Sequence, residues 1–301
     1  MAIRSSASFS HEAVLAERYY KIGTLIAEQE MAGGTTSKAK RLDTDQGRCI
    51  LRRLTGRRQA ECEYRVSKVL QGQRVCPEIL QTRGGEGWFE DGGHVYNVQS
   101  FIEAVHREAA DIGYAELGSL TGRLHAALRD QELEEQPDRF DLEHKWHDFL
   151  EARPDRDVQD ALVRRLGEYV DVCLAQKANR AGKIYIHGDL GKWNLIFGAA
   201  GIRIIDFGEA RRGDPHFDLA ALLTSTLKVS DTQARRHLSA CIEAYTLQID
   251  GFRTEALAAQ IRLWNVRGAA ALLDAVGLNE RSRRYVEDNL AQCEAWAQLL
   301  R

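Results

Sequence analysis

A chain of 301 residues is long enough for one large domain or for two lobes that share a cleft. Its 44% hydrophobic and 28% charged residues are ordinary for a globular protein, and its formal charge of −3 provides no general basic surface for nucleic acid or an anionic membrane. The six cysteines form no CxxC pair, and no apolar run is long enough for a signal peptide or a membrane span. We therefore expect a soluble, cytoplasmic protein with no nucleic acid or membrane partner.

The first hundred residues alternate short apolar runs with glycine-rich turns, a pattern that is typical of antiparallel strands. A polar helix over 59–70 carries apolar residues at helical spacing and interrupts this series. Strands are predicted at 28–31, 38–42, 49–54, 87–90 and 94–102. We expect residues 1–103 to form a small, β-rich N-terminal lobe.

The apolar spacing becomes mostly helical after residue 104. Helices are predicted at 113–128, in two segments of 141–178 that Pro154 separates, and from 218 onward, ending with 285–300. Strands at 183–186, 195–197 and 202–205 interrupt the helices. The predicted fold class is α+β and bilobal, with a small antiparallel-sheet lobe followed by a larger helical lobe over 104–301.

The most informative segment, residues 184–222, combines three short motifs. It contains His187-Gly-Asp189, then Asn194, and then Asp206-Phe-Gly208 after two apolar strands joined by a four-residue turn. Because a hairpin returns its ends to the same edge, we expect Asn194 and Asp206 to face one another. Each motif alone arises often by chance, whereas this combination is restrictive.

The residue types in this combination suit phosphoryl transfer. Mg²⁺ prefers hard oxygen ligands, which Asn194 and Asp206 provide as an amide and a carboxylate. Asp189 is separate from that pair and can accept the proton of an attacking hydroxyl or orient that hydroxyl. We therefore predict Asp189, Asn194 and Asp206 as catalytic residues, with Asn194 and Asp206 as the metal ligands.

The sequence from His187 to Asn194, together with Ile-Ile-Asp206-Phe-Gly208, resembles the catalytic core of the aminoglycoside phosphotransferase and choline kinase group, relatives of the protein kinases. The likeness continues through Gly213-Asp214-Pro-His-Phe-Asp218. It implies a protein-kinase-like fold, ATP and Mg²⁺ as cofactors, Asp189 as catalytic base and a supporting role for His187. It also implies that Asp218 braces the catalytic loop through backbone hydrogen bonds.

The resemblance places nucleotide-binding residues in the N-terminal lobe. Glycines allow close approach of a backbone to phosphates, so the turn Gly33-Gly34-Thr35-Thr-Ser37 is the predicted phosphate-covering loop, although an ordinary hairpin turn has the same pattern. By alignment, Ser100 and Ile102 would present backbone groups to the adenine.

A cation for the phosphates is expected on the third strand, where this chain has two adjacent arginines. Arg52 aligns better with the family, but Arg53 faces the other side of the strand and remains an alternative. Glu63 on the following helix is the predicted carboxylate partner, and Glu61, almost on the opposite helix face, remains open. For either glutamate, a solvent-exposed surface role is the alternative.

The predicted function is ATP- and Mg²⁺-dependent phosphorylation of a small-molecule hydroxyl. An aminoglycoside-type antibiotic is the first choice of acceptor; a metabolite such as choline, an amino acid or a sugar, or a peptide serine or threonine, is the alternative. Glu209, Asp218 and Trp264 are candidate substrate contacts, and Trp193 and Tyr245 are further aromatic candidates. A pseudokinase is disfavoured because Asp189, Asn194 and Asp206 are all present. Oligomeric state and the choice between ATP and GTP stay open.

Overall fold

The computed structural model describes residues 9–31, 38–105, 113–133, 136–177 and 183–301. The chain divides into two compact units. Unit 1 comprises Met1–His106, Glu132–Gln136 and Ile196–Gly208. Unit 2 comprises Arg107–Gln131, Pro137–Leu195 and Glu209–Arg301. Residues 196–208, which the sequence analysis placed in the C-terminal lobe, are therefore grouped with the N-terminal segment.

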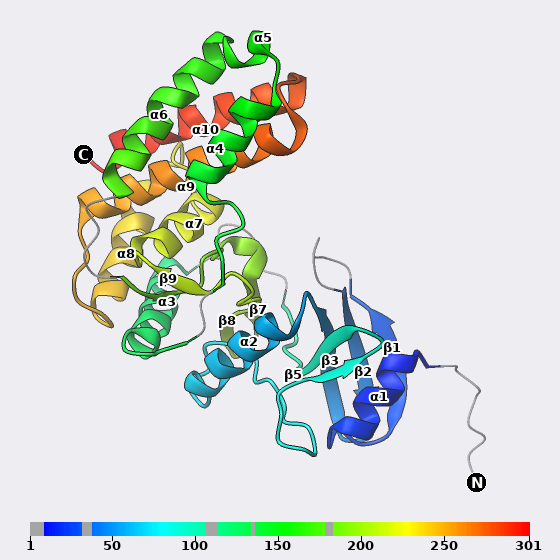
Figure 1. Ribbon diagram of the computed structural model, residues 1–301. Coiled ribbons are helices and arrows are strands. Elements are labelled where there is room, and N and C mark those ends of the chain that lie inside the picture. The colour runs from blue at the N-terminus through cyan, green and yellow to red at the C-terminus, as the bar shows by residue number, and fades with distance from the viewer. Residues whose placement is uncertain (1–8, 32–37, 106–112, 134–135, 178–182) are drawn as a thin grey trace. The chain divides into compact units, whose positions relative to one another are not determined.

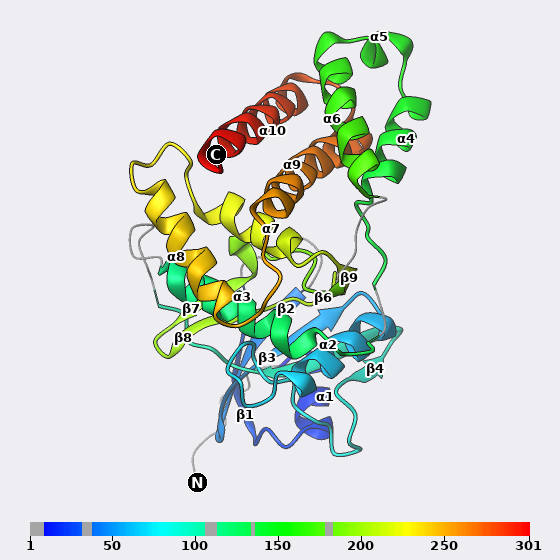
Figure 2. The same cartoon turned by 90° about the vertical axis from the view of Figure 1, so that its left-hand side faces the viewer.

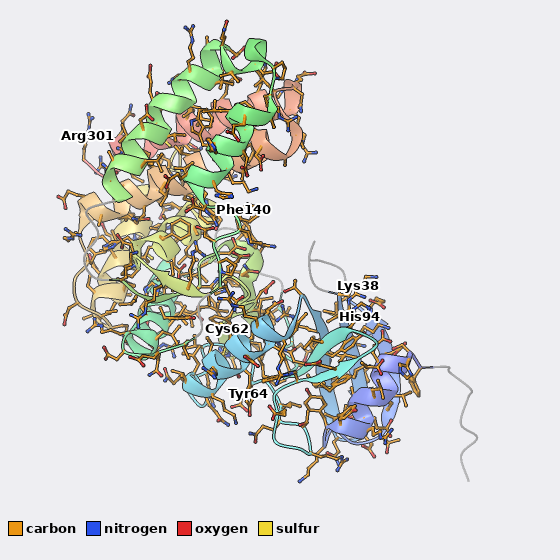
Figure 3. The ribbon with its side chains drawn as sticks, viewed as in Figure 1. Lys38, Cys62, Tyr64, His94, Phe140 and Arg301 are labelled. Atoms are coloured by element: carbon orange, nitrogen blue, oxygen red, sulfur yellow. The ribbon has the colours of Figure 1, made fainter. Side chains whose placement is uncertain are left out.

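Unit 1 is built on a five-stranded antiparallel sheet with the strand order β1-β2-β3-β5-β4 (Figure 1). Lys38 and His94 begin β2 and β5 (Figure 3). The strands are β1 Leu25–Glu30, β2 Lys38–Thr44, β3 Gly47–Leu54, β4 Phe89–Asp91 and β5 His94–Ser100. Helix α1, His11–Tyr19, packs Ala13 and Ala16 into the apolar core of the sheet, and helix α2, Arg57–Val69, contacts β3 and β5.

A short hairpin completes the described part of unit 1. Strands β7, Leu195–Gly198, and β8, Gly201–Ile204, form a two-stranded sheet. Gly201 has φ +102°, a backbone conformation that side chains other than glycine rarely adopt. The hairpin expected from the sequence is thus present, with Asn194 immediately before its first strand and Asp206 two residues after its second.

Unit 2 is mainly helical, and its longest helix, α9, lies at the centre of a four-helix cluster with α4, α6 and α10 (Figure 2). Phe149 of α4, Leu166 of α6 and Leu290 of α10 contribute fully buried side chains to this core. The helices are α3 Tyr114–Leu128, α4 Leu142–Ala152, α5 Asp155–Val158, α6 Ala161–Lys177, α7 His216–Thr226, α8 Ala234–Thr246, α9 Thr254–Val276 and α10 Glu280–Leu299.

Two close contacts in unit 2 position the loop that follows β6. Strand β6, Ile184–Ile186, pairs antiparallel with β9, Arg211–Gly213. Helix α3 packs tightly on α8, because a Cβ atom at Gly118 would lie only 2.0 Å from the carbonyl oxygen of Cys241. Glycine at this position therefore permits a helix contact that any larger residue would prevent.

The α+β fold class expected from the sequence is confirmed, and most predicted elements are present. Two described elements, α1 and β9, were not predicted, since one is weakly amphipathic and the other is only three residues long. Within the described residues, no helix is both long and apolar enough to cross a membrane. The six cysteines are free thiols.

Candidate active site

The loop after β6 holds the predicted catalytic carboxylate in a defined position. Asp189 is partly exposed, and its Oδ2 atom accepts hydrogen bonds from Asn194 Nδ2 at 3.1 Å and from Trp193 Nε1 at 3.2 Å. Asn194 Nδ2 also donates to the backbone carbonyl of Asp189 at 2.7 Å, across the 3₁₀ turn Lys192–Asn194. The carboxylate is therefore oriented from two sides while part of its surface stays accessible.

Asp218 of α7 braces this loop through its backbone. Its carboxylate accepts hydrogen bonds from the N–H groups of His187 at 2.7 Å and Gly188 at 2.9 Å. Gly188 has φ +82°, and a Cβ atom there would lie 2.1 Å from Arg211 Nη1. The bracing contacts that the family resemblance implied for Asp218 are thus present, and only glycine fits beside them.

A histidine and a tyrosine extend the brace into the helices. His125 Nε2 lies 3.0 Å from Asp218 Oδ2, and His125 Nδ1 lies 2.9 Å from the hydroxyl of Tyr245. Burial alone would raise the pKa of Asp218, but hydrogen bonding and positive charge from His125, aided by His187, lower it below the ordinary value. Because a carboxylate only accepts, Nε2 donates to Asp218, and in a neutral ring Nδ1 accepts from Tyr245.

Two predicted substrate contacts lie away from accessible surface. Asp218 has no exposed surface and is occupied by the loop, so the structure corrects its assignment as a substrate contact. Glu209 is 7% exposed and forms an ion pair with Arg139, and burial raises its pKa. Tyr245, a further aromatic candidate, is likewise buried and bonded to His125. Asp218, Glu209 and Tyr245 therefore make their polar contacts within unit 2.

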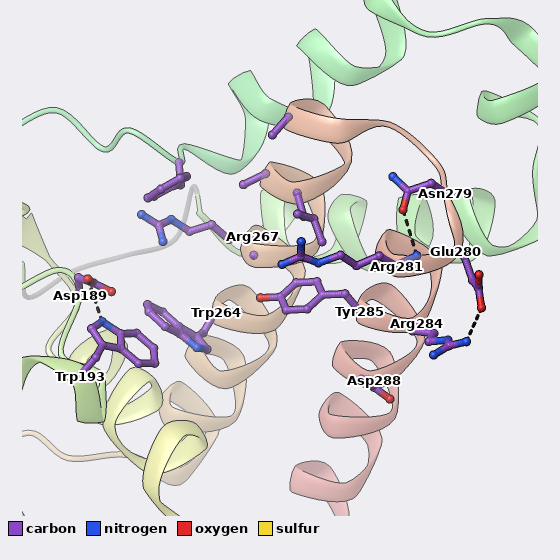
Figure 4. A pocket seen from close by; sticks show the side chains of 15 residues that line it. Asp189, Trp193, Trp264, Arg267, Asn279, Glu280, Arg281, Arg284, Tyr285 and Asp288 are labelled. Carbon is purple, nitrogen blue, oxygen red and sulfur yellow. Dashed lines mark hydrogen bonds and ion pairs between the residues drawn. The ribbon is translucent and has the colours of Figure 1, made fainter. Parts of the chain in front are cut away.

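Trp264, by contrast, lines a large cavity beside Asp189 (Figure 4). The cavity has a volume of about 1090 Å³, and all its lining residues belong to unit 2. Trp264 stacks on Trp193, with ring centroids 6.3 Å apart and planes inclined by 20°. It also meets Phe217 in a T-shaped contact at 5.4 Å, and the guanidinium of Arg267 lies 6.0 Å from its ring centroid. The lining also includes Phe140, Arg267, Arg281, Arg284, Tyr285 and Asp288, which the sequence analysis did not single out.

In unit 1, Arg52 bridges two carboxylates. Its Nη1 atom lies 2.9 Å from Glu63 Oε2, and its Nη2 atom lies 3.1 Å from Asp206 Oδ1. Glu63 also accepts from Gln59 at 2.7 Å and from Asn97 at 3.4 Å. These amides, which sequence analysis missed because single polar residues give no pattern, complete a buried polar cluster.

The cluster decides one alternative that the sequence left open, namely which glutamate pairs with an arginine of β3, whereas the choice between Arg52 and Arg53 for the phosphates stays a prediction. Arg52 pairs with Glu63, whereas Glu61 forms an i,i+4 ion pair with Arg57 near the surface. Arg53 alternates with Arg52 along β3 and is paired in register with Tyr96 of β5. Asp206 adopts φ +64°, which is uncommon for a non-glycine residue and turns the chain directly after the hairpin.

The remaining predicted nucleotide contacts are only partly covered by the structure. Gly33, Gly34, Thr35 and Ser37 lie outside the described residues. The backbone N–H of Ser100 donates to the carbonyl of Glu78, and its hydroxyl accepts from the Glu78 N–H. Ile102, two residues beyond β5, is partly exposed. The expected roles of Ser100 and Ile102 toward adenine stay predictions.

The donor set suits Mg²⁺ better than a transition metal. The described residues contain no group of three or more His, Cys, Asp or Glu side chains that could hold a metal ion. Mg²⁺ typically uses one or two protein oxygens and takes its other ligands from phosphates and water. By residue type, the carboxylate of Asp206, about one third exposed, and the amide of Asn194 each provide an oxygen of the kind that Mg²⁺ prefers.

Comparisons with known proteins agree with the sequence motifs. Residues 28–246 match a family described as the phosphotransferase enzyme family, abbreviated APH. A search by sequence against curated proteins finds no match.

Several solved structures share the fold. An amicoumacin kinase in complex with AMP-PNP and Ca²⁺ has a TM-score of 0.70 at 13% identity, over 96% of this chain and 94% of that one. An aminoglycoside phosphotransferase from Alicyclobacillus acidocaldarius has a TM-score of 0.69 at 18% identity, over 99% and 96%. A choline kinase from Streptococcus pneumoniae has a TM-score of 0.67 at 16% identity, over 95% and 99%. At these identities the likeness establishes the fold alone.

Proposed function

The chain belongs to the phosphotransferase enzyme family, and we propose that it transfers the γ-phosphoryl group of ATP to a hydroxyl group of a small molecule. One observation carries this proposal: a carboxylate oriented by two donors, Asp189, lines a cavity of about 1090 Å³. A proton acceptor at the wall of a cavity of this size suits a reaction in which a bound alcohol attacks phosphorus.

In the proposed reaction, the acceptor hydroxyl lies against Asp189, which orients it and accepts its proton. A new bond forms between the acceptor oxygen and the γ-phosphorus, the bond from that phosphorus to the bridging oxygen breaks, and ADP leaves with the electron pair. The brace from Asp218 keeps Asp189 in place, so catalysis depends mainly on positioning.

Asn194 and Asp206 would hold Mg²⁺, and Arg52, positioned by Glu63, would contact the phosphates. When bound, the metal neutralises charge on the transferring phosphoryl group. The structurally similar amicoumacin kinase is in complex with AMP-PNP, an analogue of ATP, which supports ATP as the donor. Arg52 contacts Asp206, so nucleotide and metal would compete with this ion pair for both side chains.

The finer identity of the acceptor is a separate proposal. The motif resemblance favours an antibiotic of the aminoglycoside type; a metabolite such as choline or a peptide hydroxyl is the alternative. The fold is shared with kinases of both kinds of substrate, so fold alone does not choose between them. The cavity lining does bear on this choice.

The replacement Asp189→Asn tests the proposed function. It keeps the shape of the side chain but removes the proton acceptor, so we expect acceptor-dependent ADP release to fall by about 10²-fold or more. Affinity for Mg·ATP, measured by calorimetry, should stay within about twofold, because Asp189 does not bind the nucleotide. Unchanged turnover by the variant would refute the assigned role of Asp189.

A further inference from the structure

The cavity beside Asp189 is a groove formed by one face of α9 and one face of α10 (Figure 4). From α9, Trp264, Gly268, Ala271, Leu272 and Ala275 line it at helical spacing. From α10, the lining residues are Glu280, Arg281, Arg284, Tyr285 and Asp288. Ala275 lies eleven positions after Trp264, so the lined face of α9 extends for about 16 Å.

The end of the groove next to Asp189 is a rigid aromatic wall. Trp193 is 53% exposed, yet its indole is fixed by the hydrogen bond to Asp189 and by stacking on Trp264. Phe217 in turn supports Trp264 from behind with a T-shaped contact. Exposed aromatic rings that are held in place suit the stacking of a flat apolar group.

The middle of the groove is kept open by small side chains. Gly268, Ala271 and Ala275 follow one another along α9, opposite the ring of Tyr285. A Cβ atom added at Gly268 would lie 3.0 Å from the hydroxyl oxygen of Tyr285, so even alanine would narrow the groove. The volume is that of a site for a drug-sized molecule, far larger than an amino alcohol of a few heavy atoms needs.

The charges of the lining do not form the acidic surface that a polycation requires. Three arginines accompany Asp189, Glu280 and Asp288, so the formal charges balance. Arg267 is buried and pairs with Asp138, and Arg284 pairs with Glu280. The guanidinium of Arg281 extends into the groove and has no ion-pair partner among the residues that the structure describes (Figure 4). Arg281 is thus the cation left for a ligand.

We propose that the acceptor is an elongated, drug-sized alcohol with a planar apolar ring system near its reactive hydroxyl and an anionic group at its far end. The ring system stacks on Trp193 and Trp264, and the anionic group binds Arg281. This inference rests on the proposed phosphotransferase function and narrows it, and it disfavours polycationic aminoglycosides and choline as acceptors.

A matched series of probes tests the proposal. The probes are 2-(hydroxymethyl)naphthalenes that carry at position 6 a short alkoxy chain ending in a carboxylate, an ammonium or a methyl group, compared with kanamycin and choline. Calorimetry measures their affinity without nucleotide, and coupled ADP release measures their turnover. We expect the carboxylate probe to bind about tenfold more tightly than the ammonium probe, as one charge-assisted contact provides.

Three variants separate the contributions of the lining. Arg281→Gln should abolish the preference for the carboxylate probe, and Trp264→Leu should weaken all naphthalene probes by about tenfold through lost stacking. Arg236→Gln is the control: Arg236 is an exposed residue of α8 outside the lining, and its replacement removes the same charge. This variant should bind the carboxylate probe and the ammonium probe as tightly as the wild type does. Tighter binding of kanamycin, choline or the ammonium probe, or an unchanged preference in Arg281→Gln, overturns the inference.

Binding and turnover also separate this inference from the proposed function. If the carboxylate probe binds with the expected preference but releases no ADP, the groove assignment holds and the assignment of phosphoryl transfer fails. If ADP release occurs only with aminoglycosides or choline, the enzyme is a kinase and the acceptor class proposed here is wrong.

Discussion

Glu63 of unit 1 and Asp218 of unit 2 are equally buried carboxylates with opposite electrostatics. They are 2% and 0% exposed. Burial raises the pKa of Glu63, and the attraction of Arg52 offsets this only in part because Asp206 repels the same charge. Burial also acts to raise the pKa of Asp218, yet His125, His187 and the backbone N–H of His187 outweigh it and lower that pKa.

The difference lies in the kind of partner. Asp218 is held by the N–H groups of His187 and Gly188, which cannot leave without unfolding the loop. Glu63 is held by the side chain of Arg52, which also contacts Asp206 and can change partners when a ligand arrives. Backbone partners thus make Asp218 a permanent brace, whereas side-chain partners leave Arg52 able to exchange contacts, as its proposed role toward nucleotide requires.

The replacement Asp218→Asn should have the largest effect on stability. The amide supplies one acceptor oxygen where two are used, and its NH₂ group would face a donor of the loop or of His125. We expect the free energy of unfolding, from urea denaturation at pH 7, to fall by about 3 kcal/mol. A loss below about 1 kcal/mol would contradict the role of Asp218 as a brace.

The pH dependence of this loss should follow the lowered pKa of Asp218. A carboxyl group whose pKa is lower in the folded state stabilises the protein above its unfolded pKa, near 3.8, and loses that contribution as the pH falls further. The stability difference between the wild type and Asp218→Asn should therefore be constant between pH 7 and pH 5 and shrink below about pH 4. If this stability difference instead grows as the pH falls, the pKa of Asp218 is raised in the folded state and not lowered.

The outer member of the brace should contribute less. Tyr245→Phe removes the hydroxyl that is hydrogen-bonded to His125 Nδ1 but keeps the ring, which contacts Phe252 edge-on. One buried hydrogen bond is lost, so unfolding should become easier by about 1 kcal/mol, with Mg·ATP affinity unchanged. A loss as large as that of Asp218→Asn would mean that the histidine, rather than the loop backbone, dominates the brace.

The local parts of the site were predictable from the sequence. The hairpin between Asn194 and Asp206 is encoded by two apolar runs around a short turn. The family resemblance pointed to the Arg52–Glu63 pair, although Arg53 and Glu61 stayed open as alternatives. These features depend on residues that are neighbours in the chain. Their spacing alone limits where the side chains can lie.

The distant parts were not predictable, because they depend on helix packing. Asp218 meets His125, 93 residues away, and His125 meets Tyr245, 120 residues away, through the close contact of α3 with α8. The groove has the same origin, since α9 uses one face for the apolar core and another, with Trp264, for the cavity. Helical spacing indicates an apolar face, but only the packed structure shows what that face contacts.

The replacement Glu63→Gln should have the smallest effect on stability. It is also the sharpest test of the contrast between the buried carboxylates Glu63 and Asp218. Because burial raises the pKa of Glu63, its ionised form is less favourable in the folded protein than in the unfolded chain, and Arg52 keeps Asp206 as a partner. We expect the free energy of unfolding to change by less than about 1 kcal/mol at pH 7, although the same chemical change at Asp218 costs far more. Mg·ATP affinity should fall by about tenfold, because Arg52 loses the carboxylate that orients it.

The control Glu61→Gln, on the same helix but near the surface, should alter neither the free energy of unfolding nor that of Mg·ATP binding by more than about 0.5 kcal/mol. Equal destabilisation by Glu63→Gln and Asp218→Asn would show that burial alone, rather than the kind of partner, determines what a buried carboxylate contributes.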